Sequence, residues 1–275
     1  MSAWPSGNAP LTHPSETVPE TSRRSFRRFL VVTALRDEAV TFCRGAGPSF
    51  YPLSLGRALQ SDPGGDWRER GGFPVIYSGP GSWGLDNLGT LFSGGDVASV
   101  LFLGFAGGMT PSLVAGDILV GTRVMKAGCG SYPVFPPDFL SLRYRTGTIL
   151  SVGHPVGTPA EKVRLQAETG GDVVDMESAG WLACASRHSV QGWVVRVVSD
   201  AAGETLPPEM MAFVDSQGET SLRGIVKTLL MRPAVIPAIL SLVRGMVRAH
   251  ISLRDLGSLV SQHVESGHGP EGDSR

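Results

Sequence analysis

Short apolar runs rich in β-branched residues most constrain what this chain can fold into. The runs are continuous rather than alternating, which is typical of strands that are buried on both faces of a sheet. They comprise residues 29–34, 73–78, 100–103, 117–121, 148–152, 172–175 and 193–199. Helical patterns lie between some of these runs, at 159–169 and 176–188. The sequence therefore predicts an α/β fold, a three-layer α/β/α sandwich with a mixed central sheet.

The chain divides into four predicted parts. We expect residues 1–25 and 261–275 to be disordered tails, because they are rich in small and polar residues. Residues 26–222 form the α/β domain, and residues 223–260 form a C-terminal amphipathic helical segment. The longest uncharged piece of that segment, 233–243, is far below the ~20 residues that a membrane-spanning helix needs.

Charge and cysteine usage exclude several functions. The chain has 24 basic and 25 acidic residues, which gives no electrostatic reason to expect a nucleic-acid partner. Its lysines are Lys126, Lys162 and Lys227, and none follows a glycine as a P-loop requires. The 3 cysteines have no C-x-x-C spacing. We therefore expect a cytoplasmic protein without disulfides, and we predict no metal site and no cofactor.

Three acidic residues follow predicted strands, where α/β folds keep their sites. They are Glu38, Glu177 and Asp200. Each alone could be a helix-terminal or capping carboxylate. Together, and beside the glycine-rich stretches that contain Gly79 and Gly104, they predict a polar pocket.

The sequence around these residues resembles the nucleoside phosphorylase and nucleosidase superfamily. The motifs that carry the likeness are 104–118, 174–179 and 195–200, in the expected order. The resemblance covers roughly residues 29–205, and it implies a nucleoside phosphorylase-like fold. Leu-Pro-Pro at 206–208 and Leu-Leu-Met-Arg-Pro at 229–233 also resemble the hopanoid-associated branch, whose members cleave adenosylhopane. Methylthioadenosine/adenosylhomocysteine nucleosidases and futalosine hydrolases are near neighbours of that branch.

The resemblance implies cleavage of the N-glycosidic bond of a purine nucleoside. Asp200 would protonate the purine at N7, which requires a carboxyl that keeps its proton near neutral pH through burial. An aspartate at this position is what the family associates with adenine. Glu38 would be the general base that activates water, and Glu177 with Met176 beside it would bind the ribose.

The resemblance implies further substrate-binding residues, namely Gly79, Gly104, Arg196 and Val156. Both glycines would lie in loops whose backbone approaches the nucleoside closely, and Arg196 would lie near the water or the acidic site. Val156 falls where the family places an aromatic ring against the base. Tyr132 or Phe135 could supply that ring instead, or could belong to the core.

Two positions favour water over phosphate as the nucleophile. Phosphorylases of the bacterial purine type use an arginine and a serine to hold phosphate, and the matching positions here are Phe102 and Phe105. The leading hypothesis is hydrolysis of adenosylhopane to release adenine. The alternatives are a soluble methylthioadenosine/adenosylhomocysteine or futalosine nucleosidase, and a non-catalytic nucleoside- or lipid-binding module.

The expected partner is a small-molecule nucleoside, which is lipid-linked in the leading hypothesis. Residues 229–250 combine a broad apolar face with interspersed arginines. They could pack on the sheet, pack against a second copy in a homo-oligomer, or contact the inner membrane face peripherally.

Overall fold

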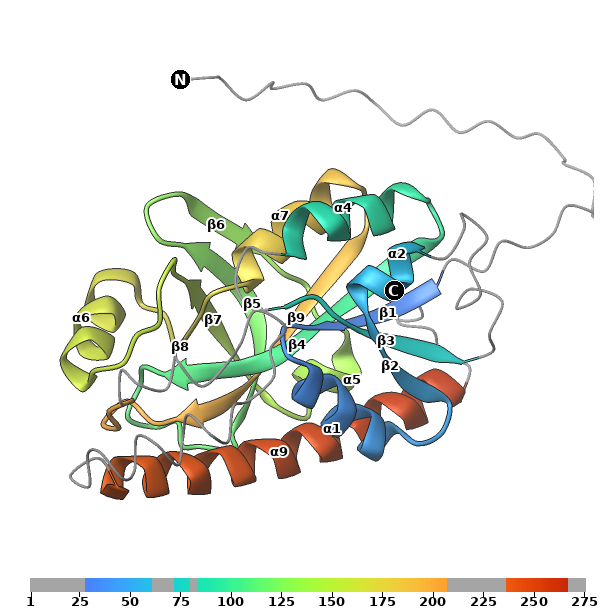
Figure 1. Ribbon diagram of the computed structural model, residues 1–275. Coiled ribbons are helices and arrows are strands. Elements are labelled where there is room, and N and C mark those ends of the chain that lie inside the picture. The colour runs from blue at the N-terminus through green and yellow to red at the C-terminus, as the bar shows by residue number, and fades with distance from the viewer. Residues whose placement is uncertain (1–27, 61–71, 80–83, 207–235, 267–275) are drawn as a thin grey trace, which may run out of the picture.

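The structure is a computed structural model that describes residues 28–60, 72–79, 84–206 and 236–266 (Figure 1). A central mixed sheet carries helices on both faces. Helices α4 (Leu85–Ser93) and α7 (Ser178–Arg187) pack together on one face, whereas α1 (Arg36–Ala46) and α9 (Ile236–Glu265) pack together on the other. The predicted fold class is therefore confirmed.

The predicted apolar runs all lie on strands, and two strands were not predicted. The sheet in the described residues has 9 strands, in the order β2-β3-β1-β4-β8-β7-β5-β6, with β9 paired to β4 and β5. The unpredicted strands are β2 (Phe50–Ser54) and β6 (Gly130–Pro133). The others are β1 (Arg28–Thr33), β3 (Phe73–Tyr77), β4 (Val97–Gly108), β5 (Ile118–Lys126), β7 (Arg145–Ser151), β8 (Val173–Asp175) and β9 (Gln191–Asp200).

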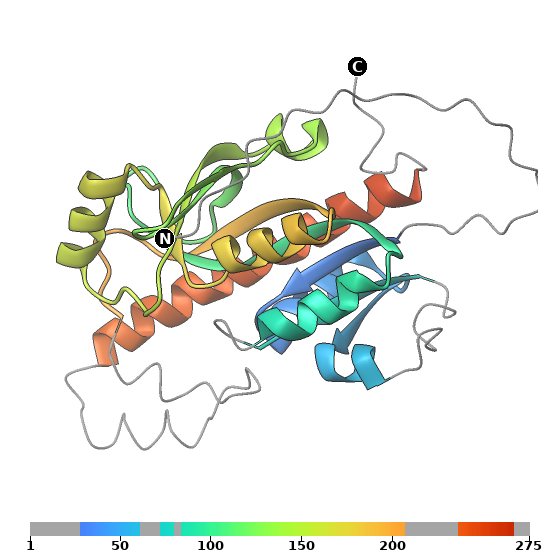
Figure 2. The same ribbon diagram turned by 90° about the horizontal axis from the view of Figure 1, so that it is seen from above.

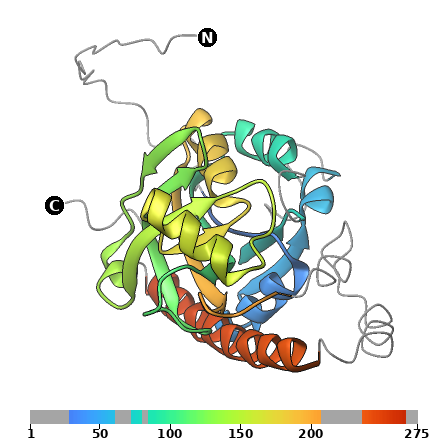
Figure 3. The same ribbon diagram turned by 90° about the vertical axis from the view of Figure 1, so that its left-hand side faces the viewer.

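Part of the sheet closes on itself, because β9 pairs with strands on both of its sides. It is parallel to β4 and antiparallel to β5. From β5 the ladder continues through β7 and β8 and returns to β4. Figure 3 looks toward this closed part from the side on which α6 (Pro159–Thr169) lies in Figure 1. The closure brings the carboxyl ends of β4, β8 and β9 close together.

Strand β4 is much longer than predicted, and this corrects the expectation for Gly104. The expected glycine loop at 104–108 is strand, and its pairing with β9 shifts register between Ala106 and Gly107. Such an irregularity bends a strand and re-aims the side chains beside it. The glycines at this point therefore shape the end of a strand rather than a loop.

Helix α6 has the predicted bounds, and Thr158 caps its N-terminus. The Thr158 hydroxyl accepts a hydrogen bond from the Glu161 N–H at 3.3 Å, and Pro159 occupies the first helical position. Gly170 ends the helix with a left-handed φ of 70°. Local capping chemistry is sufficient to define this element. Two shorter helices complete the described fold, α2 (Leu55–Gln60) and α5 (Asp138–Ser141).

Helix α9 runs to Glu265, so it passes the predicted boundary between a helical segment and a tail at residue 260. It packs across α1 and runs along one face of the sheet beneath β9 (Figure 1, Figure 2). A Cβ on Gly257 would lie 2.4 Å from the Phe42 carbonyl oxygen, which shows how closely the two helices approach. The predicted tail at 1–25 and the start of the predicted helical segment, 223–235, lie outside the described residues.

In the part of the chain that the structure describes, no helix is both long and apolar enough to cross a membrane.

Candidate active site

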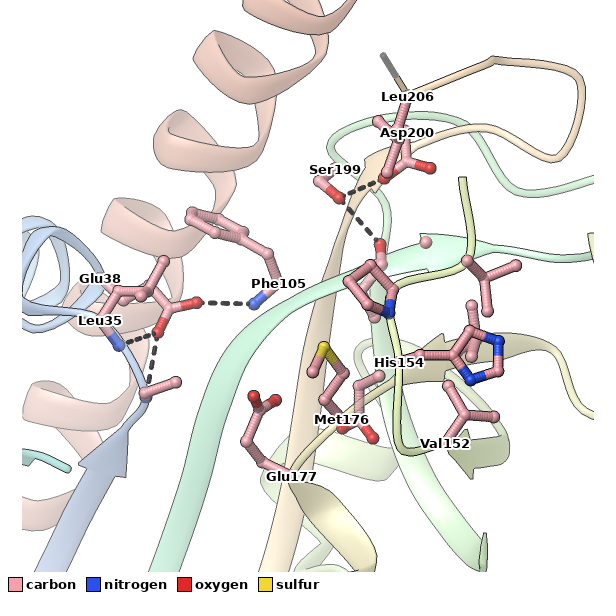
Figure 4. A pocket seen from close by; sticks show the side chains of 17 residues that line it. Leu35, Glu38, Phe105, Val152, His154, Met176, Glu177, Ser199, Asp200 and Leu206 are labelled. Atoms are coloured by element: carbon pink, nitrogen blue, oxygen red, sulfur yellow. Dashed lines mark hydrogen bonds between the residues drawn. The ribbon is translucent and has the colours of Figure 1, made fainter. Parts of the chain in front are cut away.

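A cavity of about 280 Å³ lies where β4, β8 and β9 end (Figure 4). It brings together most of the predicted site residues. Those that line it are Glu38, Val156, Met176, Glu177 and Asp200. They come from segments that are far apart in the sequence, so the fold places them in one site.

Glu38 lies in the first turn of α1, and backbone N–H groups hold its carboxylate. One oxygen accepts from the N–H groups of Ala34 at 3.1 Å and Leu35 at 2.9 Å. The other accepts from the Phe105 N–H at 2.9 Å (Figure 4). Burial raises the pKa of Glu38 to about 7, although these N–H groups and the charge of Arg196 act to lower it. The carboxyl therefore titrates near neutral pH, as a general base should.

A buried hydrogen-bond network fixes the turn that carries Met176 and Glu177. Asp175 accepts from the Arg196 Nε at 2.6 Å and from the Ser151 hydroxyl at 2.5 Å. The Ser178 hydroxyl donates to Asp175 and accepts from Arg196 Nη2 at 2.8 Å. Because both ends of the 176–177 turn are tied down, its two side chains are held at the cavity wall.

Arg196 is not among the residues that line the cavity. Its side chain is buried and bound to Asp175 on β8, so it helps to position the turn. Gly104 explains how the side chain fits beside β4. A Cβ at Gly104 would lie 2.8 Å from Arg196 Nη1 and 3.1 Å from Glu38 Oε1. The missing side chain leaves room for these two charged groups.

Gly79 is also outside the set of residues that line the cavity. It has a left-handed φ of 89°, and its N–H donates to the Ala34 carbonyl at 2.9 Å. Ala34 itself lines the cavity. Gly79 therefore supports the wall, since a glycine tolerates this backbone conformation.

Asp200 is paired with a lysine that the sequence analysis did not identify as part of the site. The buried ammonium group of Lys162 on α6 donates to Asp200 Oδ2. Ser199 Oγ lies 2.6 Å from Asp200 Oδ1. The predicted acid is thus in direct contact with a buried cation. The one available signal was a lysine in the first turn of a helix, where the dipole disfavours a cation.

The structure does not place Tyr132 or Phe135 at the cavity. Both line a separate cavity beside Gln191, at the other end of β9. The rings at the site belong instead to Phe105 and His154, which Figure 4 shows on different sides of the cavity. The sequence did not identify His154 as a site residue.

The lining also bears on anion binding. Among the described residues that line the cavity, none is lysine or arginine. Lys162 and Arg196, the buried cations nearest to it, are paired with Asp200 and Asp175. Phosphate recognition requires a guanidinium, an ammonium or a dense set of N–H donors.

A family comparison matches residues 9–231 to the phosphorylase superfamily. The chain belongs to this superfamily. The match includes every residue of the cavity and both of its buried ion pairs. A comparison with curated protein sequences gave no match.

Solved structures share this superfamily fold. Helicobacter pylori futalosine hydrolase is 18% identical over 86% of this chain and 98% of its own, with a TM-score of 0.59. A Helicobacter pylori 5′-methylthioadenosine/S-adenosylhomocysteine nucleosidase is 19% identical over 86% and 99%, with a TM-score of 0.58. The corresponding Campylobacter jejuni nucleosidase is 14% identical over 86% and 99%, with a TM-score of 0.55. At these identities the likeness shows the fold.

The positioning role of Arg196 predicts a large effect on stability. Arg196→Met would leave the Asp175 carboxylate buried without its ionic partner, and we expect a loss of about 3–5 kcal/mol in the free energy of unfolding, measured with urea at pH 7. Arg164→Met is the matched control, because it removes an exposed arginine whose partner, Glu168, lies one turn along α6. The control should unfold like the wild type. Wild-type stability in Arg196→Met would contradict the positioning role.

Proposed function

We propose that this protein hydrolyses the N-glycosidic bond of an adenosine-type nucleoside and releases adenine. The observation that carries the proposal is the placement of Glu38, Glu177 and Asp200 around one cavity, on separate sides of it (Figure 4). Membership of the phosphorylase superfamily supports it, as do nucleosidases and a hydrolase of the same fold.

Each carboxylate has a distinct task in this reaction. Glu38 takes a proton from water as the water oxygen bonds to C1′ of the ribose. The C1′–N9 bond breaks, its electron pair moves into the purine, and Asp200 delivers a proton to N7. Glu177 binds the ribose hydroxyls, and its negative charge stabilises the cationic sugar. Met176 packs beside the ribose.

Water is favoured over phosphate because of the charges at the cavity. Its described lining offers no guanidinium or ammonium group, and a phosphate would meet three carboxylates, Glu38, Glu177 and Asp200. Repulsion between these groups and an anion would disfavour phosphorolysis.

The proposed substrate within this class is adenosylhopane, and the exposed face of α9 supports a lipid-linked substrate. Large apolar side chains follow one another at helical spacing on that face and are about half exposed. They are Leu240, Val243, Val247 and Ile251, at 48%, 51%, 54% and 57%. Arg244 and Arg248, both exposed, lie between them. Apolar side chains flanked by arginines suit the surface of an anionic bilayer.

A soluble nucleosidase is the alternative. The Helicobacter pylori structures that share the fold are a futalosine hydrolase and a methylthioadenosine/adenosylhomocysteine nucleosidase, so the same architecture accepts small soluble nucleosides in those proteins. The third possibility is a binding module without turnover.

One assay distinguishes the three proposed functions. Adenine release by the full-length protein would be measured with adenosylhopane in mixed micelles and with methylthioadenosine, with and without phosphate. We expect adenosylhopane to react faster and phosphate to have no effect. Asp200→Asn should lower kcat by about 10²–10⁴-fold. A rate that depends on phosphate would contradict hydrolysis, faster cleavage of methylthioadenosine would favour the soluble alternative, and no release would favour the binding module.

The pKa of Glu38 predicts the acid limb of the pH profile. Glu38 acts in its ionised form, so kcat/KM should rise about tenfold per pH unit below pH 7 and level off above it. Glu38→Gln should lower kcat and remove this limb, because the amide neither titrates nor accepts a proton. If the acid limb persists in Glu38→Gln, the limb belongs to another titrating group.

The exposed face of α9 predicts binding to anionic vesicles. We expect the wild-type protein to co-sediment with phosphatidylglycerol-containing vesicles, and Val243→Ser with Val247→Ser to weaken binding about tenfold or more. Val163→Ser is the matched control, because Val163 is 60% exposed on α6. If the double variant instead converts a dimer to a monomer, the face binds a second copy of the chain.

A further inference from the structure

Lys162 is completely buried, yet it is next to the site. Its ammonium group donates to Asp200, to the Ala201 carbonyl at 2.7 Å and to the Glu204 carbonyl at 3.3 Å. Three acceptors match the three N–H bonds of an ammonium group. The geometry therefore fits a charged lysine whose hydrogen-bonding capacity is fully used.

Strand β4 shields one side of the ion pair between Lys162 and Asp200. A Cβ at Gly107 would lie 3.3 Å from Asp200 Oδ2 and 3.6 Å from Lys162 Cε, so the strand backbone packs directly against both groups. Lys162 is not among the residues that line the cavity, whereas Asp200 is. Any effect of Lys162 on a bound nucleoside must therefore pass through Asp200.

Further charges surround the lysine beyond its direct partner. Burial raises the pKa of Glu204, but hydrogen bonds from Ser241 and the Ala201 N–H, together with the charges of Lys162 and Arg248, lower it overall. The loop after β9 thus places a second carboxylate near Lys162.

A buried ion pair gives little net stability compared with apolar residues of the same volume. The presence of such an ion pair at Asp200, the proposed acid, therefore needs a chemical explanation. An ionised Asp200 accepts hydrogen bonds but has no proton to give to N7. The nearest group that carries a transferable proton toward Asp200 Oδ2 is the Lys162 ammonium.

We propose that Lys162 is a positioning residue that supplies, through Asp200, the proton that the leaving adenine receives. This rests on the proposed N-glycosidase activity. As C1′–N9 lengthens, an N–H bond of Lys162 breaks and an O–H bond forms on Asp200. That O–H bond then breaks as N7–H forms. The proton lost by the attacking water goes to Glu38, and exchange with solvent returns both residues to their starting states.

The test compares two leaving groups. Adenine release from adenosylhopane needs a proton at N7, whereas 4-nitrophenolate leaves from 4-nitrophenyl β-D-ribofuranoside without one. Lys162→Met should lower kcat for adenine release by about 10²–10⁴-fold and change kcat for 4-nitrophenolate release little. Arg164→Met, a neighbour on the exposed side of α6, should leave both rates unchanged.

Lys162→Arg is the second variant, because it keeps a cation next to Asp200 and so protects the fold. Arginine does not release its proton in proteins, so this variant should remain slow with adenine as the leaving group. Adenine release at the wild-type rate by either Lys162 variant would overturn the proposal. An equal loss of kcat with both leaving groups would overturn it too, because such a loss indicates a structural role.

The wild-type protein distinguishes this proposal from the function on which it rests. Release of neither adenine nor 4-nitrophenolate by the wild type would refute the N-glycosidase activity and the role of Lys162 together. An active wild type with unaffected Lys162 variants would refute only the role of Lys162.

Discussion

The ion pair between Arg196 and Asp175 joins two strands of the closed part of the sheet that are not hydrogen-bonded to each other. Arg196 lies on β9 and Asp175 ends β8, and each side chain is 1% exposed. Burying two charges is costly, and the hydroxyls of Ser151 and Ser178 offset part of that cost by completing the hydrogen bonds. The turn with Met176 and Glu177, and the space that Gly104 leaves open, both depend on this pair.

The surroundings of the buried carboxylates differ, and this difference separates their chemical roles. Asp175 and Asp200 each form an ion pair with a buried cation. Glu38 is held by backbone N–H groups and has no cation in direct contact in the described structure, so burial dominates and its pKa rises to about 7. Unequal surroundings are how one site gives its carboxylates different chemical roles.

The sequence predicted what depends on local pattern and missed what depends on pairing across the fold. Apolar runs located the strands, and the helical pattern at 159–169 located α6. The distant partners of charged residues leave no local pattern, so the pairing of Arg196 with Asp175 and of Lys162 with Asp200 was not predicted. Glycine has the same ambiguity, because Gly104 could serve a loop or, as found, a strand that packs against charged side chains.

Helix α9 connects the two proposed properties of the protein, because its two faces meet different surroundings. On its inner face, a Cβ at Gly245 would lie 2.4 Å from the Ser199 carbonyl oxygen, and Ser241 donates to Glu204 at 2.6 Å. The helix thus supports the end of β9 that carries Asp200 and the loop that binds Lys162. Its outer face, with Val243 and Val247, is exposed. Because these faces are separate, changes on the outer face should alter where the enzyme acts without altering the chemistry at Asp200.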